Sequence, residues 1–114
     1  MGIATATQVI EMVVAEKRLV SVSFDKVLDS GEAITGTPTA TEVTTSDLTI
    51  GSVSASTAVL TIDNESIGIG RAMQFLVSGQ VAANSPYSIL MTAVTDSSPA
   101  QTIKRFCTVR VVSE

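Results

Sequence analysis

The clearest alternation of apolar and polar residues in the sequence is RLVSVSFD, residues 18–25. Val20, Val22 and Phe24 fall on one side of an extended chain, and serines lie between them. Successive side chains of a β-strand point to opposite faces of a sheet, so this period of two predicts a strand with one buried and one solvent-facing side. The stretch therefore favours an all-β fold.

Further segments of the same kind follow, separated by turn residues such as Asp29-Ser30-Gly31 and Asp96-Ser97-Ser98-Pro99. They are short, rich in Val, Ile and Thr, and have no helical periodicity between them. The expected strands are residues 18–25, 33–41, 48–50, 57–62, 73–77, 87–95 and 102–112, and residues 63–70 form the longest expected loop. Short strands at this regular spacing predict a seven-stranded antiparallel immunoglobulin-like β-sandwich.

Tyr87 supports this prediction, because it stands at the start of the expected strand 87–95. In such sandwiches a tyrosine at the start of the penultimate strand hydrogen-bonds to backbone a few residues upstream. We expect the same bond here. The antibody subtype is excluded, since the chain has one Cys and no Trp and therefore lacks the disulfide and the buried indole of that subtype.

The first 16 residues, MGIATATQVIEMVVAE, are harder to assign. Their apolar residues fit neither a helical stripe nor strict alternation. Small and β-branched residues suit an extended segment that adds to a neighbouring sheet, and a short helix is the alternative. We expect residues 1–16 to be an N-terminal extended arm and residues 17–114 to form the sandwich.

The composition argues against catalysis, because the 114 residues contain no His and a single Cys. Without an imidazole there is no Ser-His-Asp or Cys-His pair and no His-ligated metal. One thiol cannot form a disulfide within the chain. We therefore expect a protein that is not an enzyme and that needs no cofactor.

Charge and hydropathy limit the partners. Seven basic and eleven acidic residues give a formal net charge of -4, which opposes binding to nucleic acid and to an anionic membrane surface. The mean hydropathy is high at +0.41, yet no apolar run approaches the roughly 20 residues of a membrane span. The first eight residues also lack the pattern of a secretion signal. We expect the surplus apolar surface to be covered by other subunits, including copies of this chain.

Three local patterns are candidates for chemical sites. Residues 63–65, DNE, offer oxygen ligands for Ca²⁺ but lack the alternating acidic spacing of a calcium loop, so a solvated loop is favoured. Cys107 shares its strand face with Val109 and is expected to be a small buried hydrophobe. Residues 68–71, GIGR, lack the G-x-G-x-x-G spacing and precede a strand, which argues against a phosphate loop.

Two basic pairs stand out in this acidic chain, Lys17-Arg18 and Lys104-Arg105. Either pair could contact acidic patches on a partner. The simpler interpretation is solvation, because exposed ion pairs contribute only about 0 to 1 kcal/mol each.

Several segments together carry a resemblance to a known group of proteins. They are LDSGEAIT at 28–35, LTI at 48–50, FLVSG at 75–79, PYSI at 86–89 and KRFCTVRV at 104–111. With this order and spacing, residues 17–114 resemble small immunoglobulin-like proteins encoded among the structural genes of tailed bacteriophages. The chain departs from that group at Ser30, at Pro86 and at SSPA, residues 97–100. The shared positions are turn and core positions, so they bear on fold more than on role.

The resemblance implies a virion component that assembles in the host cytoplasm. The first expectation is a capsid cement or decoration protein that binds the assembled major capsid protein as a homo-oligomer. The alternatives are a tail or tail-fibre adaptor, which would bind other phage structural proteins, and an adhesion module for host carbohydrate. We expect the partner-binding residues in and just after the arm, at Val9, Ile10, Met12, Val13, Lys17 and Arg18.

Overall fold

The structure, a computed structural model, describes residues 8–62 and 64–112. Residues 1–7 of the predicted arm and Asp63 of the predicted loop lie outside the described residues. The described residues form one short 3-10 helix at Ala82–Asn84 and nine strands: β1 (Gln8–Val13), β2 (Arg18–Ser23), β3 (Ile34–Val43), β4 (Thr49–Ala55), β5 (Leu60–Ile62), β6 (Glu65–Ile67), β7 (Ala72–Ser78), β8 (Tyr87–Thr95) and β9 (Thr102–Val112).

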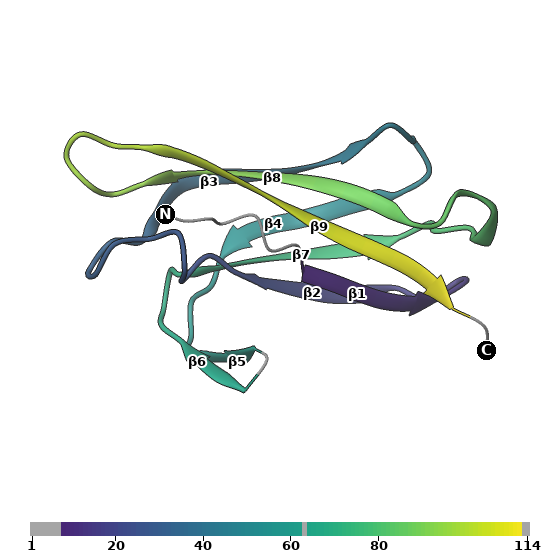
Figure 1. Ribbon diagram of the computed structural model, residues 1–114, viewed down its shortest axis with the longest axis horizontal. Coiled ribbons are helices and arrows are strands. Elements are labelled where there is room, and N and C mark those ends of the chain that lie inside the picture. Colours follow the sequence, from purple (N-terminus) through teal and green to yellow (C-terminus); the bar gives the residue numbers. More distant parts are fainter. Residues whose placement is uncertain (1–7, 63, 113–114) are drawn as a thin grey trace.

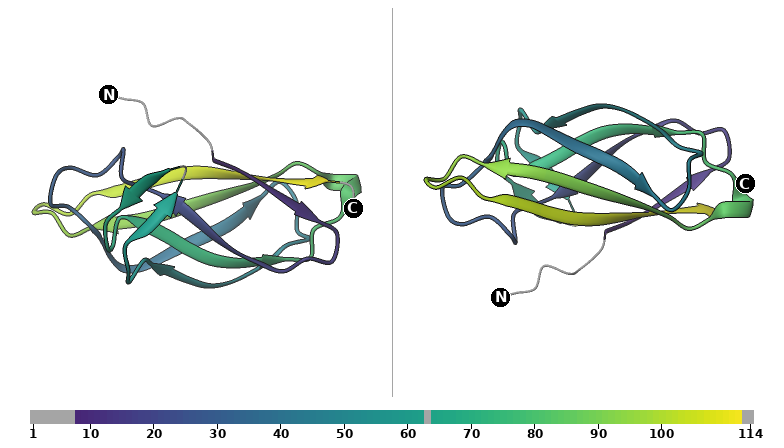
Figure 2. Two further views of the ribbon diagram at one scale, coloured as in Figure 1. Left: turned by 90° about the horizontal axis from the view of Figure 1, so that it is seen from below. Right: turned by 90° about the horizontal axis from the view of Figure 1, so that it is seen from above.

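Two main sheets face each other as layers (Figures 1 and 2). One has four strands in the order β1-β9-β8-β3, and the other has three in the order β2-β7-β4. A separate hairpin, β5-β6, projects at the end where the β2–β3 and β8–β9 loops lie (Figure 1). The predicted all-β, sandwich-like architecture is therefore confirmed.

The predicted strand number and direction were wrong. The described residues hold nine strands instead of seven, because β1 forms within the expected arm and β6 forms within the expected loop 63–70, where it pairs with β5. The fold is mixed instead of antiparallel, because β1 runs parallel to β9, with Val9 opposite Thr108. Part of the predicted arm is thus a strand of the chain's own sheet. Its pairing joins segments from opposite ends of the sequence, which no local pattern reveals.

Strand boundaries were predicted best where alternation is strict. The bounds of β8 and β9 are those expected, and β2 begins at Arg18 as expected. In contrast, β4 continues past Gly51 to Ala55, where the sequence suggested an end. A register shift between Gly51 and Ser54 accommodates Ser52, whose φ is 55°. A bulge of this kind lets a strand continue through a glycine.

The core lies between the two main sheets. Val20, Val22 and Phe24 are all buried, as their alternation predicted. They pack with residues from β7, β8 and β9 in one cluster, whose largest members include Phe75, Tyr87, Met73, Ile89 and Met91. A second, smaller cluster of Ile62, Ile67 and Ala72 supports the β5-β6 hairpin.

Tyr87 makes the predicted bond to upstream backbone. Its hydroxyl accepts from the Val81 N–H at 2.9 Å and donates to Asp47 Oδ2 at 2.8 Å. Burial raises the pKa of Tyr87 above its ordinary value, although the Val81 backbone bond opposes the shift. Because Asp47 lies in the β3–β4 loop and Val81 follows β7, the tyrosine ties both loops to the start of β8.

Candidate functional site

The pairing of β1 with β9 decides which predicted partner-binding residues of the arm reach the surface. Val9 lies opposite Thr108 and is 51% exposed on the outer face of the four-stranded sheet. Met12 points inward and is 1% exposed. Ile10 is half-buried and packs against the same core, and Val13 is also half-buried. The structure therefore places Val9 where a partner can reach it and Met12 where a partner cannot.

Lys17 and Arg18 lie at the turn between β1 and β2. Both are exposed, and Arg18 pairs with Glu16 at 3.7 Å. The buried Gln80 stabilises this turn, because its Nε2 donates to the carbonyls of Val13 at 2.7 Å and Glu16 at 2.9 Å. The two cations are thus presented on a fixed turn, at the opposite end of the sandwich from the β5-β6 hairpin (Figure 1).

Apolar side chains gather on the outer face of the four-stranded sheet beside Val9. Leu90 of β8 lies directly opposite Phe106 of β9, and Phe106 is 48% exposed. Val9 is the diagonal neighbour of Phe106, because its partner Thr108 is two residues further along β9. We name Val9, Leu90 and Phe106 the outer apolar patch. Neither Phe106 nor Leu90 was predicted to lie at the surface, although the alternation around Cys107 places Phe106 on the solvent side.

The predicted basic pair Lys104-Arg105 is divided by strand alternation. Lys104 is exposed on the outer face, whereas Arg105 is buried on the face that carries Cys107. Burial lowers the pKa of Arg105 below its ordinary value. The interpretation of this pair as two surface charges was therefore wrong for Arg105, because adjacent residues in a strand point to opposite faces.

Cys107 is buried, as predicted from its strand face. Burial raises the pKa of its thiol to about 12. A thiol with so high a pKa is almost entirely protonated near neutral pH, and the thiolate is the reactive form. The Cys107 side chain therefore contributes to the packing of the main core cluster.

Arg71 organises the β2–β3 loop at the hairpin end of the sandwich. Its Nε donates to Asp25 Oδ1 at 2.6 Å, and its Nη2 donates to the carbonyls of Asp25 and Leu28, each at 3.2 Å. Its Nη1 donates to the carbonyls of Asp29, at 3.0 Å, and Glu32. Arg71, the last residue of GIGR, thus binds this chain's own backbone. This is consistent with the prediction that residues 68–71 are not a phosphate loop.

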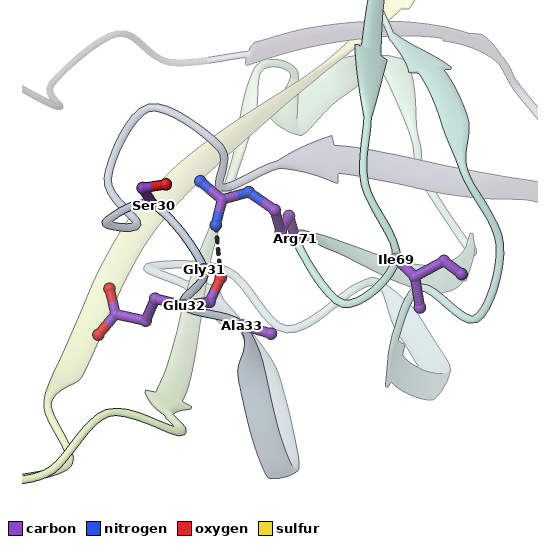
Figure 3. Close-up of a pocket in the computed structure, with 6 residues that line it drawn as sticks. All are labelled: Ser30, Gly31, Glu32, Ala33, Ile69 and Arg71. Carbon is purple, nitrogen blue, oxygen red and sulfur yellow. Dashed lines mark hydrogen bonds between the residues drawn. The ribbon is translucent and has the colours of Figure 1, made fainter.

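An open hollow of about 550 Å³ lies beside this loop. It is lined by Ser30, Gly31, Glu32, Ala33, Ile69 and Arg71 (Figure 3). The carboxylate of Glu32 points away from Arg71 (Figure 3) and accepts from the Asp29 N–H at 2.8 Å. This backbone bond is the main cause that lowers the pKa of Glu32. The Arg71 donors already bind the loop. A ligand in the hollow would therefore meet mostly backbone and the exposed Ile69 side chain.

The predicted loop 63–70 is partly structured. Glu65 begins β6 and pairs with Lys26 at 3.2 Å, and Asp63 lies outside the described residues. Within residues 8–62 and 64–112, no three His, Cys, Asp or Glu side chains come together as a metal site requires. In the same described part of the chain, no helix has the length and apolar character to cross a membrane.

Comparison with known proteins gives no relative: no family model, no curated protein and no solved structure matches the chain.

Proposed function

We propose that the chain is a non-enzymatic structural protein of a tailed bacteriophage virion, a capsid cement or decoration protein. It binds the assembled shell of major capsid protein, in the host cytoplasm where virions assemble. The observation that supports the proposal is the outer apolar patch, in which Val9, Leu90 and Phe106 cross three strands of one sheet. Contiguous apolar surface of this kind is suited to cover by another subunit.

The strand order supports an immunoglobulin-like arrangement within the sandwich. In that fold the second, fourth and fifth core strands share one sheet, and the third, sixth and seventh share the other. With the β5-β6 hairpin set aside, β2-β7-β4 and β9-β8-β3 follow this division. The bond from Tyr87 to Val81 fits the same arrangement. The resemblance to phage proteins, which rests on turn and core residues, is consistent with it.

A decoration protein stabilises a shell by mass action, because it binds assembled subunits and not free ones. Each patch is small, so one contact would be weak. A homo-oligomer would multiply weak contacts through effective concentration. We therefore propose that several copies of the chain act together on the shell.

The test compares two valines of similar exposure, Val9 at 51% and Val59 at 59%. Val9 lies in the patch, whereas Val59 precedes β5 in the projecting hairpin. We expect Val9→Ser to weaken cosedimentation with shells of the phage's major capsid protein by roughly tenfold per site, the effect of losing about 1.4 kcal/mol of apolar contact. Val59→Ser is the matched control and should bind as the parent does. Equal binding by all three proteins, or no binding by the parent, would contradict the proposal.

Point variants are needed because deletion of the whole arm is not a clean experiment. Removal of residues 1–16 would take β1 out of its sheet and Met12 out of the core. Loss of binding would then follow from partial unfolding as readily as from loss of contact. Val9→Ser avoids this, since its side chain is on the outer face.

A tail or tail-fibre adaptor would use the same patch and differ in its partner and its copy number. Quantitative counting of copies per particle separates the two: hundreds indicate the head, and about a dozen or fewer indicate the tail.

The hollow beside Arg71 favours a different candidate, an adhesion module that binds host carbohydrate through loops at one end of the sandwich. Specific binding of the parent protein on a glycan array, lost in Ile69→Asp, would support that candidate.

A further inference from the structure

The three-stranded sheet differs from the four-stranded sheet in its charge. Strands β4 and β7 contain no charged residue, and β2 contains only Arg18, at its first position. The strands of the four-stranded sheet contain five charged residues: Glu11, Glu42, Lys104, Arg105 and Arg110. The central part of a protein–protein interface is depleted of charged residues relative to other surface. The outer face of β2-β7-β4, named here the uncharged face, therefore has the composition of an interface.

An apolar row crosses the middle of the uncharged face. Leu76 of β7 lies opposite Leu19 of β2 on one side and opposite Gly51 of β4 on the other. Leu19 is 58% exposed. Leu76 points outward, because its neighbours Phe75 and Val77 are buried in the core. We name Leu19, Leu76 and Gly51 the cross-strand row.

The β5-β6 hairpin covers one end of the uncharged face. By strand alternation Ala72 points to the same side as Leu76, yet it is fully buried because Ile62 and Ile67 pack on it. The hairpin projects from the three-stranded sheet, away from the four-stranded one (Figure 1). The other end of the face, beside the β1–β2 turn, is open. The two ends of the face therefore differ in shape.

The two ends also differ in charge. At the open end, the β1–β2 turn carries Lys17 and Arg18 against Glu16. At the hairpin end, Lys26 and Arg71 stand against four acidic residues, Asp25, Asp29, Glu32 and Glu65. The open end is thus basic and the hairpin end is acidic.

We propose that a second copy of this chain docks on the uncharged face, about a two-fold axis that lies between the two sheets and runs across the strands at the cross-strand row. Each strand then lies antiparallel over its counterpart, so Leu19 meets Leu19 of the second copy and Leu76 meets Leu76. Such a contact is isologous and closes with two copies. The hairpin end of each copy lies beside the open end of the other. Lys17 and Arg18 are thereby set next to the other copy's acidic residues.

Charge favours a second copy in this orientation. The formal net charge of -4 makes two copies repel each other over most of their surface. On the uncharged face no like charges meet, and at its two ends opposite charges meet. The alternative two-fold axis, parallel to the strands, would set hairpin against hairpin and acidic end against acidic end. The antiparallel arrangement avoids both conflicts.

The size of the face predicts a weak dimer. Strand spacing and rise give the face about 14 by 20 Å, and two such faces bury less than the roughly 1,200 Å² of stable complexes. The contact therefore forms at high protein concentration, or where copies are held close together. It involves this chain alone, so it goes beyond the proposed function and is tested without capsid protein.

Analytical ultracentrifugation of the full chain, from about 10 μM to about 1 mM, tests the proposal. We expect the weight-average mass to rise from 11.8 kDa toward twice that value. Leu19→Glu brings like charges together at the axis and should weaken association at least tenfold. Val94→Glu is the matched control: Val94 is 41% exposed on β8 of the other sheet, so this variant should associate as the parent does. Urea midpoints verify that both variants are folded.

Two further variants test the orientation. Leu19→Cys lies on the axis and faces its own counterpart, so a short bis-maleimide should link two copies at least tenfold faster than it links Val94→Cys. The native Cys107 is buried and does not react. Lys17→Glu should weaken association at least about threefold, because it adds an acid beside the other copy's acidic end, and high salt should remove this difference.

Each outcome decides the question. Association that is lost in Leu19→Glu and kept in Val94→Glu, with faster linking through residue 19, supports the proposal. A parent that stays monomeric at every concentration overturns it, as does equal association of the parent and Leu19→Glu, or equal linking of the two cysteine variants. No effect of Lys17→Glu overturns the antiparallel orientation. Val9→Ser should dimerise as the parent does, so failure of this proposal and failure of the capsid proposal are distinguishable.

Discussion

The Nε of Arg71 lies 2.6 Å from Asp25 Oδ1, although the two residues are 46 positions apart in the chain. The same guanidinium donates to four carbonyls of the β2–β3 loop. One side chain, from the residue just before β7, therefore fixes the shape of the loop that follows β2.

Arg71→Lys should lower the free energy of unfolding by about 2 to 4 kcal/mol, because an ammonium cannot reproduce the planar fork of donors and leaves loop carbonyls without partners. Chemical denaturation measures the change. Arg110→Lys is the control: Arg110 is exposed and contacts Glu11 at 3.6 Å, so its substitution should stay within about 0.5 kcal/mol. Equal effects at the two positions would show that the loop network adds nothing to stability.

Gly79 should be intolerant of any side chain. Its φ is +89°, and a Cβ at this position would stand 2.6 Å from the Asp47 carbonyl oxygen. Gly31, with φ of +80°, has open space around the same atom and serves as the matched control. We expect Gly31→Ala to cost about 1 kcal/mol of unfolding free energy from backbone strain alone, and Gly79→Ala to cost at least about 2 kcal/mol, since backbone must also move. If thermal melts show the two variants to be equally stable, the close approach to Asp47 is wrong.

Tyr87→Phe should destabilise the fold by about 1 to 3 kcal/mol, because it leaves the Val81 N–H without its acceptor and takes a donor from Asp47. The ring itself still fills the core, so far-UV circular dichroism should not change. Urea titration of the parent and variant measures the difference. Tyr87 is the one tyrosine in the sequence, so the variant also removes the tyrosine absorbance. An unchanged urea midpoint would contradict the prediction.

Stability should fall in acid partly through Glu32. The folded-state pKa of this carboxyl is lowered below its ordinary value of 4.5, chiefly by the Asp29 backbone N–H. A lowered folded pKa means that the stabilisation is complete above about pH 4.5 and is lost as the pH falls through the folded value. In Glu32→Gln the loss of stability below pH 4.5 should be shallower than in the parent, as measured by urea midpoints between pH 6 and 2. A slope in Glu32→Gln equal to that of the parent would contradict the prediction.

Cys107 should resist thiol reagents in the folded protein. Its pKa of about 12 leaves almost no thiolate at pH 8, and its side chain is buried. We expect labelling by iodoacetamide only after addition of denaturant, with a folded-state rate at least a hundredfold below that of the unfolded chain. Mass spectrometry after timed labelling measures both rates. Prompt modification of the native protein would contradict the burial of this strand face.

The candidate site could be predicted only in part. Val9 was expected to meet a partner and does lie on the surface, whereas Met12 was expected to do so and lies in the core. The two differ because β1 joins the chain's own sheet and thereby acquires an inner and an outer face. Phe106 was expected in neither role, although the strict alternation of β9 contained the information that it faces solvent.

By itself, the sequence determined that the chain is all-β, where β8 and β9 begin and end, and that Val20, Val22, Phe24 and Cys107 are buried. These are local properties, because alternation at a period of two specifies a strand and its faces without reference to any partner. Only the tertiary structure decided that β1 lies parallel to β9 and that Arg71 binds the β2–β3 loop. Those features depend on which distant segments meet, and no short stretch of residues determines the free energy of such contacts.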